Sequence, residues 1–358
     1  MILLAARILS FCLGLWLVLF TLMSATRTFV LPRSDNVWLT RQVFTSSRRL
    51  FGLFGRKSDT YAQRDKFMAF FAPITLLTLP VVWLALVTIG YTGIYWALGV
   101  HPPGEQWNWQ EAFNLSGSSL LTLGFRYEGR LETIIFEFTE ATIGLLLVAI
   151  LMAYLPTMYA AFSKRETQVS LLEVRAGSPP SAVELLSRFH RLHGLDSLAD
   201  VWRNWEIWFA ELEETHTSLA PLVFFRSPKP DRSWVTAAGV ILDSAALARS
   251  TLDIQHHPQI DLCLRSGYIA LRSIADFFRI PYDPNPQKGD PISVAQQEFD
   301  IAYEEMAARG LPVKPDRQQC WEDFAGWRVN YDRVLLALAE LTMAPYAPWI
   351  SDRGLQRR

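Results

Sequence analysis

The chain has 358 residues, half of them hydrophobic, and its 34 basic and 35 acidic residues leave a net charge of −1. An average globular protein is more polar, so this composition favours a membrane protein. The balanced charge gives no sign of a nucleic-acid partner. The three cysteines lack the close spacing of a disulfide framework or a metal cluster (Cys12, Cys263 and Cys320).

Three stretches are each long and apolar enough to cross a bilayer, which takes about 20 residues. The first, 1–24, contains a single charged residue, Arg7. A secretory signal peptide is the alternative there, but its apolar core is long and no A-x-A-like site follows, so we favour a retained helix. The second, 67–100, has no charge, and the third, 134–162, has only two acids, Glu137 and Glu140.

The distribution of charge predicts how these helices are oriented. Residues 27–66 hold nine basic residues against three acids, whereas 101–130 hold two basic residues and three acids. The positive-inside rule then places 25–66 and 163–358 in the cytoplasm, with the N-terminus and 101–130 outside. We expect a multi-pass protein of the cell (inner or cytoplasmic) membrane, in contact with lipid.

The basic connection 25–66 leaves two interpretations open. Its apolar and arginine residues alternate loosely between 38 and 54, which fits an interfacial helix lying on the inner leaflet as well as an ordinary basic loop. In the following span, Pro73 is expected to separate an initial turn from the helix proper. The second and third spans and the segment between them make up a predicted domain at 67–162.

The remaining part, 163–358, reads as a cytoplasmic helical domain without strand alternation. Ser181-x-x-Glu184 has the pattern of a capping box, and Trp202, Trp205 and Trp208 fit a core or a subunit interface. His190 and His193 would share a helix face, although a metal site there is a weak expectation. The predicted helices are 181–193, 197–216, 232–254, 259–279, 291–309 and 316–343.

Between the second and third spans lies a short amphipathic segment. Asn108-x-x-Glu111 marks a helix start, so 109–121 is predicted to form a helix of about three turns. Thr122-Leu-Gly-Phe125 would then return outward only if extended, with its carbonyl oxygens facing a narrow axial path. Gly124 allows the carbonyl to turn inward without a Cβ penalty. Irregular backbone at that depth must line water or be buried in protein.

This segment resembles the pore loop of the two-helix potassium-channel superfamily. Six positions match its pattern directly (Ala112, Phe113, Ser116, Thr122, Gly124 and Phe125). The resemblance covers about 67–162 and implies an all-α fold in which each subunit supplies a re-entrant pore helix and a selectivity filter (Thr122, Leu123, Gly124 and Phe125). It also implies that Gly144 is a hinge glycine, and Pro156 suits a gate.

One departure concerns the outer mouth. Where the family has its second filter glycine, this chain has Arg126, and a non-glycine residue at positive φ costs on the order of 1 kcal/mol. Four arginines around a pore would also repel cations unless Glu128 or Glu111 neutralises them. Support for the pore helix is expected from Glu111, Ser118, Glu137 and Glu140, with Glu140 either bonded to that helix or active in gating.

These features predict the pore-forming subunit of a homotetrameric cation channel with potassium or another monovalent cation as the permeant ion, regulated through 163–358 by an unidentified ligand or protein. The alternative is a non-conducting membrane-anchored scaffold with a degenerate pore loop. We see no Ser-His-Asp order, HExxH or P-loop in the sequence, so we expect no enzyme activity, no cofactor and no metal.

Overall fold

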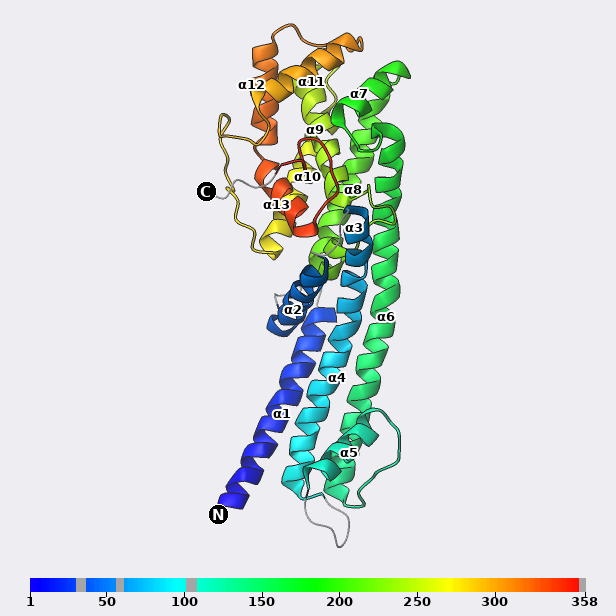
Figure 1. Cartoon of the computed structure of the whole chain (residues 1–358), viewed down its shortest axis with the longest axis vertical. Helices are drawn as coiled ribbons and strands as arrows, with labels where there is room; N and C mark the ends of the chain where they lie inside the picture. The colour runs from blue at the N-terminus through cyan, green and yellow to red at the C-terminus, as the bar shows by residue number, and fades with distance from the viewer. Residues whose placement is uncertain (30–36, 56–60, 101–107, 354–358) are drawn as a thin grey trace. The chain divides into compact units, whose positions relative to one another are not determined.

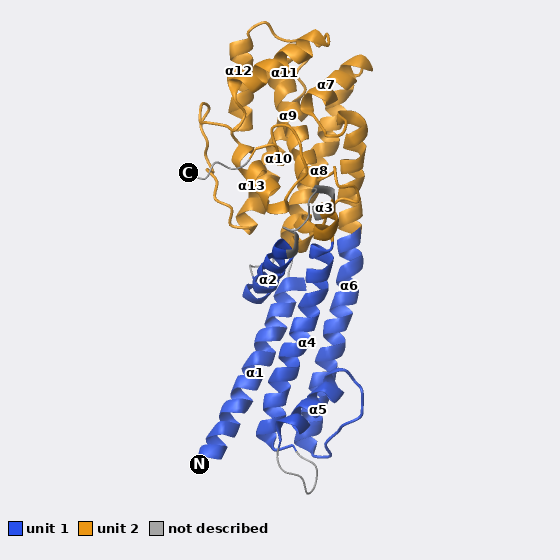
Figure 2. Ribbon diagram, viewed as in Figure 1, with its two compact units in different colours: residues 1–57, 70–159 blue, residues 58–69, 160–358 orange. Residues whose placement is uncertain are grey.

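The computed structural model describes residues 1–29, 37–55, 61–100 and 108–353. Within those ranges every regular element is helical, and the only β-type pairing is an isolated bridge between Leu252 and Val313 (Figure 1). The predicted all-α class is confirmed there. The chain divides into two compact units, 1–57 with 70–159 and 58–69 with 160–358 (Figure 2).

The first unit holds three helices that are long and apolar enough to span a membrane, as the sequence predicts. They are α1 (Ile2–Phe29), α4 (Phe71–Leu98) and the first part of α6 (Leu131–Ala176). Helices of 28 residues reach about 42 Å, more than the roughly 30 Å of the hydrocarbon core. Large apolar side chains on their outer faces are exposed, which fits contact with lipid. The unit also contains α2 (Trp38–Gly55) and α5 (Trp109–Leu120).

Helices α1 and α4 approach each other closely through small residues. A Cβ added to Gly14 would lie 2.4 Å from the carbonyl oxygen of Gly90, so only glycine fits there. Ser10 Oγ donates to the carbonyl of Gly93 at 2.9 Å, one turn away. Small residues and hydroxyl bonds of this kind stabilise helix pairs in membranes, where apolar burial between helices contributes little.

The basic connection is partly helical. The interpretation as an ordinary loop is wrong for 38–55, which form α2, whereas 30–36 and 56–60 lie outside the described residues. A second short helix, α3 (Tyr61–Ala69), ends just before α4 begins at Phe71. Pro73 therefore lies in the first turn of α4, where a missing N–H costs nothing, and the break precedes it.

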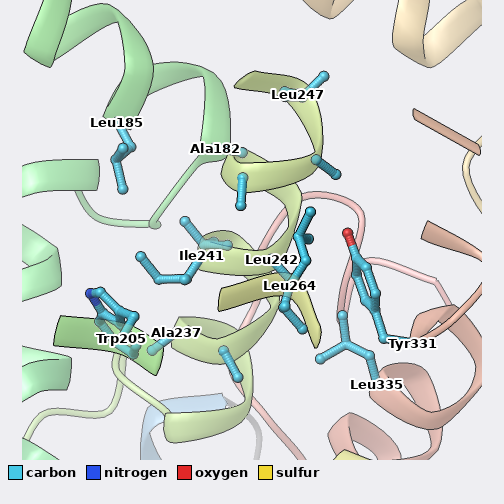
Figure 3. Packing of buried hydrophobic residues seen from close by; sticks show 14 of the residues in the cluster. Ala182, Leu185, Trp205, Ala237, Ile241, Leu242, Leu247, Leu264, Tyr331 and Leu335 are labelled. Carbon is cyan, nitrogen blue, oxygen red and sulfur yellow. The ribbon is translucent and has the colours of Figure 1, made fainter. Parts of the chain in front are cut away.

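The second unit packs its helices around α9 (Trp234–Thr251), which is buried along nearly its whole length (Figure 3). Around it lie α7 (Ala182–Arg191), α8 (Leu198–Ser218), α10 (Pro258–Phe277), α11 (Gln296–Ala308), α12 (Arg317–Arg328) and α13 (Asp332–Thr342), with 3-10 turns at Leu195–Ser197 and Ala220–Phe224. Trp202, Trp205 and Trp208 are at most 2% exposed, which places them in the core of this unit.

The prediction of a single helix at 316–343 is wrong, because the helix is interrupted between the end of α12 at Arg328 and the start of α13 at Asp332. The Asn330 side chain donates to the carbonyls of Gly326 and Trp327 at 3.1 and 3.2 Å. A side chain that binds the last carbonyls of a helix competes with the next turn of backbone. The predicted helix at 291–309 similarly begins only at Gln296, after an irregular segment that follows Pro291.

The capping box predicted at Ser181 does not form. Ser181 is the N-cap of α7, but its side chain makes no capping bond. The Glu184 carboxylate instead accepts bonds from Arg188, Arg191 and Arg309. Three guanidinium groups outcompete a single backbone N–H, since charge-assisted bonds are about twice as strong as neutral ones.

Candidate functional site

The segment that resembles a pore loop begins with a capped helix. The Asn108 side chain accepts from the Gln110 N–H at 3.1 Å, which confirms the predicted start of α5. Glu111 lies in the first turn, where a negative charge is favourable. Ala112 and Leu115 are fully buried, whereas Phe113 is 54% exposed, so α5 has one face on the unit and one free face.

Helix α5 ends in a left-handed turn at Thr122. The N–H of Leu123 donates to Ser118 O at 2.8 Å and the N–H of Thr122 to Ser119 O at 3.1 Å, while Thr122 has φ +53°. This is the Schellman arrangement, which satisfies the last carbonyls of a helix and usually uses glycine. The expectation that the chain is extended from Thr122 onward is therefore wrong at Thr122 itself.

Ser118 closes the loop that follows. Its Oγ accepts from the Arg126 N–H at 3.0 Å and donates to the Arg126 carbonyl at 2.9 Å. Residues 119–125 thus form a closed loop whose two ends meet at one buried hydroxyl. Ser118 was expected to support the short helix, and its two bonds to Arg126 show how it holds the loop after that helix. The family pattern did not predict these bonds.

The strip inside this loop has little contact with the rest of its own chain. Leu121, Leu123 and Phe125 are 55%, 61% and 63% exposed. Gly124 has φ +70°, and a Cβ added there would meet no heavy atom within 4 Å in the described chain. The segment from Thr122 to Phe125 is therefore exposed on the surface of the isolated chain.

The strain expected at Arg126 is absent, because Arg126 is not among the described residues with positive φ. The left-handed residue is Thr122, four positions earlier. Of the two acids that could neutralise Arg126, Glu111 forms the ion pair. Glu128 instead lies 3.5 Å from Arg130, so the charge on Arg126 is balanced by an acid in the first turn of α5.

Glu140 joins three helices of the first unit. Its fully buried carboxylate accepts from Ser116 Oγ of α5 at 2.5 Å and from the Tyr95 hydroxyl of α4 at 2.8 Å. The expected bond between Glu140 and the short helix is present. Glu137, one turn earlier, accepts from the backbone N–H of Glu128 at 3.0 Å. Sequence reasoning missed Tyr95, because a tyrosine among many aromatic residues in a span carries no distinguishing signal.

Gly144 is a point of close backbone approach between α5 and α6. A Cβ added there would lie 2.2 Å from the carbonyl oxygen of Leu120, the last residue of α5. The glycine expected as a hinge thus also permits α5 to end directly against α6. Pro156, expected near a gate, is exposed and lies within α6, which continues without interruption to Ala176.

In the second unit, buried charged residues pair with one another through ion pairs and hydrogen bonds. Arg328 is fully buried and pairs with Asp243 and Asp332, while Tyr331 donates to Asp243 at 2.9 Å. Burial opposes the charge of Arg328, but the two aspartates outweigh it and raise the pKa of the guanidinium. Burial, reinforced by the neighbouring Arg165, lowers the pKa of His216 well below its ordinary value, so this histidine is neutral at pH 7.

Among the described residues, no group of three or more His, Cys, Asp or Glu side chains is arranged to hold a metal ion. His193 has φ +54° and lies beyond the end of α7 at Arg191, so it does not share a helix face with His190.

Comparison of the chain with family models, curated proteins and solved structures gives no match.

Proposed function

We propose that this chain is the pore-forming subunit of a tetrameric cation channel, with potassium as the permeant ion. In this proposal α5 is a re-entrant pore helix and the carbonyls of Thr122, Leu123, Gly124 and Phe125, with the Thr122 hydroxyl, line the filter. Carbonyl oxygens in rings can replace the hydration shell of a monovalent cation. The protein would need no cofactor.

The observation that carries the proposal is the exposed strip between two fixed ends. Leu123 and Phe125 are more than 60% exposed, yet Ser118 fixes both ends of their loop. An apolar loop that is rigidly held and makes few contacts within its own chain is suited to pack against symmetry-related copies. Four such loops around an axis would bury these side chains behind the filter and leave the backbone facing the ions.

The surrounding charges support a cation path. Glu111 balances Arg126, so the four copies of this arginine would not confront the ion as unpaired charges. Glu140 fixes α5 to α4 and α6, and Glu128, beside Arg130, would remain near the outer mouth. Preorganised contacts of this kind are what a filter needs, because a displaced carbonyl ring no longer matches the ion.

The remaining roles follow from the same topology. The N-terminus and the loop before α5 would lie outside a bacterial inner membrane, with 163–358 in the cytoplasm. Gly144 and Pro156 would be the hinge and gate positions of the inner helix α6. The second unit, whose residues 160–176 continue α6, would bias that helix in response to a ligand or protein partner.

A non-conducting scaffold is the second candidate, and the geometry at Thr122 favours it. The Schellman bonds occupy the carbonyls of Ser118 and Ser119, and a left-handed threonine begins the strip. In that function the loop would be an outward-facing recognition element. The second unit would then be an anchored interaction domain.

Flux of rubidium into liposomes separates the two functions. Purified tetramer should admit rubidium above the level of empty liposomes, and Arg126→Gly should change the ion preference while flux persists. A confirmed tetramer in which neither the native protein nor Arg126→Gly admits rubidium would leave the scaffold as the better account.

A further inference from the structure

Helix α2 has a face that is largely exposed in the described chain, although the Trp38 ring lies 6.4 Å from that of Phe20. Trp38, Arg49 and Leu53 are exposed, and residues 11 and 15 apart return to nearly the same side of a helix. Leu39 and Phe51 of the same helix are by contrast buried, at 8% and 9% exposed. The outer face therefore combines an indole, a leucine and a guanidinium group, a composition typical of a membrane interface.

Contacts place α2 at the level where two spans end. Thr28 Oγ1, in the last turn of α1, lies 2.7 Å from Thr40 Oγ1. The ring centroids of Phe51 and Phe71 are 5.7 Å apart, and Phe71 is the first residue of α4. Figure 1 shows α2 beside the C-terminal end of α1. In a bilayer crossed by α1 and α4, α2 would therefore lie at headgroup depth.

The charged residues of α2 itself are all basic. Helix α2 carries three basic residues and no acid (Arg41, Arg48 and Arg49). Arg27, in the last turn of α1, is exposed beside them. No carboxylate in the described part of the chain pairs with Arg27, Arg41 or Arg49, so this surface retains its positive charge.

We propose that α2 is a binding site for anionic phospholipid headgroups, with Arg41 and Arg49 on the lipid phosphates and Trp38 and Leu53 at the acyl boundary. The occupant is a lipid because the apolar side chains adjoin the ends of two membrane spans. The proposal needs only that α1 and α4 cross a bilayer, and it stands whether or not the loop at 122–125 conducts ions.

Titration of the full-length protein in uncharged detergent with phosphatidylglycerol or phosphatidylcholine tests this site. Trp38 is 62% exposed, so its fluorescence should report occupation, and the part of the signal lost in Trp38→Phe belongs to α2. Each arginine near an anionic surface contributes about 1 kcal/mol, or roughly fivefold. Arg41→Gln with Arg49→Gln should therefore raise the half-saturating phosphatidylglycerol concentration about 25-fold.

The matched control removes two exposed arginines of the second unit, Arg265→Gln with Arg333→Gln, and should leave that concentration unchanged. The proposal is overturned if phosphatidylcholine gives the same Trp38 response as phosphatidylglycerol, or if the control pair shifts the titration equally. Inorganic phosphate that saturates the same signal would also overturn it, by assigning the site to a soluble anion. Gel filtration and circular dichroism of both double variants establish that each is folded.

Discussion

Ser118 Oγ binds both the N–H and the carbonyl of Arg126, at 3.0 and 2.9 Å, and so closes the loop between α5 and the segment leading to α6. The hydroxyl thereby binds the two peptide groups on either side of the Arg126 Cα, and this fixes both the position and the orientation of the backbone there. The loop conformation therefore depends on Ser118 more than on any side chain within the loop.

Ser118→Ala should release this closure. Loss of the hydroxyl leaves the partly buried N–H of Arg126 without its partner, at a cost of about 1–2 kcal/mol. We expect the Arg126 amide to exchange its hydrogen at least about tenfold faster, as measured by mass spectrometry of the solubilised protein. Ser119→Ala is the control, since no bond of its side chain is found in the described chain. Equal acceleration in both variants would contradict the closure.

Gly144→Ala should displace the end of α5. Its Cβ would approach the Leu120 carbonyl oxygen to 2.2 Å, and overpacking of this kind costs typically about 1–3 kcal/mol. A lower melting temperature and loss of any rubidium flux are expected. Gly117→Ala, on α5 with open space around its Cβ, should melt at the native temperature or slightly above it, because alanine favours a helix. An unchanged melting temperature for Gly144→Ala would show that the two backbones are farther apart.

Arg328→Met should strongly destabilise the second unit. It leaves the buried carboxylate of Asp243 without its cation, which typically costs about 3–5 kcal/mol. Urea unfolding followed by tryptophan fluorescence should shift to lower denaturant, and Asp243→Asn in the same chain should recover part of the loss. Arg333→Met, exposed five residues away, should have little effect. A double variant less stable than Arg328→Met would argue against direct pairing.

The stability of the second unit should depend on pH through Glu184. Its burial raises the pKa, but bonds from Arg309, Arg188 and Arg191 outweigh burial and lower the pKa from 4.5 to about 2. A lowered pKa stabilises the fold above pH 4.5, and this stabilisation is lost as the pH falls toward 2. Glu184→Gln should cost about 1–2 kcal/mol at neutral pH, as expected for a partly buried charged cluster.

Thermal melts of native protein, Glu184→Gln and the exposed control Glu214→Gln across this pH range check the prediction. The difference between native protein and Glu184→Gln should shrink steadily on acidification. A difference that stayed constant down to the lowest pH would exclude ionisation of Glu184 as its source.

The sequence predicts the helical class, the three spans and the start of α5 well, because these depend on local hydropathy and capping residues. The sequence-based predictions fail where a single side-chain interaction decides the local structure. Asn330 binds the last carbonyls of α12 and ends that helix, and three arginines bind the Glu184 carboxylate, which was expected to cap α7. The Thr122 turn could not be predicted either, because glycine, the usual residue of such a turn, is absent there. The bond of Glu140 to the short helix was expected, but its second partner, Tyr95, is set by tertiary packing and leaves no spacing signal.

The left-handed backbone of Thr122 bears on the function of the loop. A β-branched residue in the left-handed region is disfavoured by about 1 kcal/mol, and glycine or asparagine would end α5 at a lower cost. Thr122→Gly should therefore raise the melting temperature slightly if the threonine side chain contributes nothing in the isolated subunit. A more stable protein that no longer assembles or conducts would identify the methyl and hydroxyl groups of position 122 as functional groups, retained at the expense of folding.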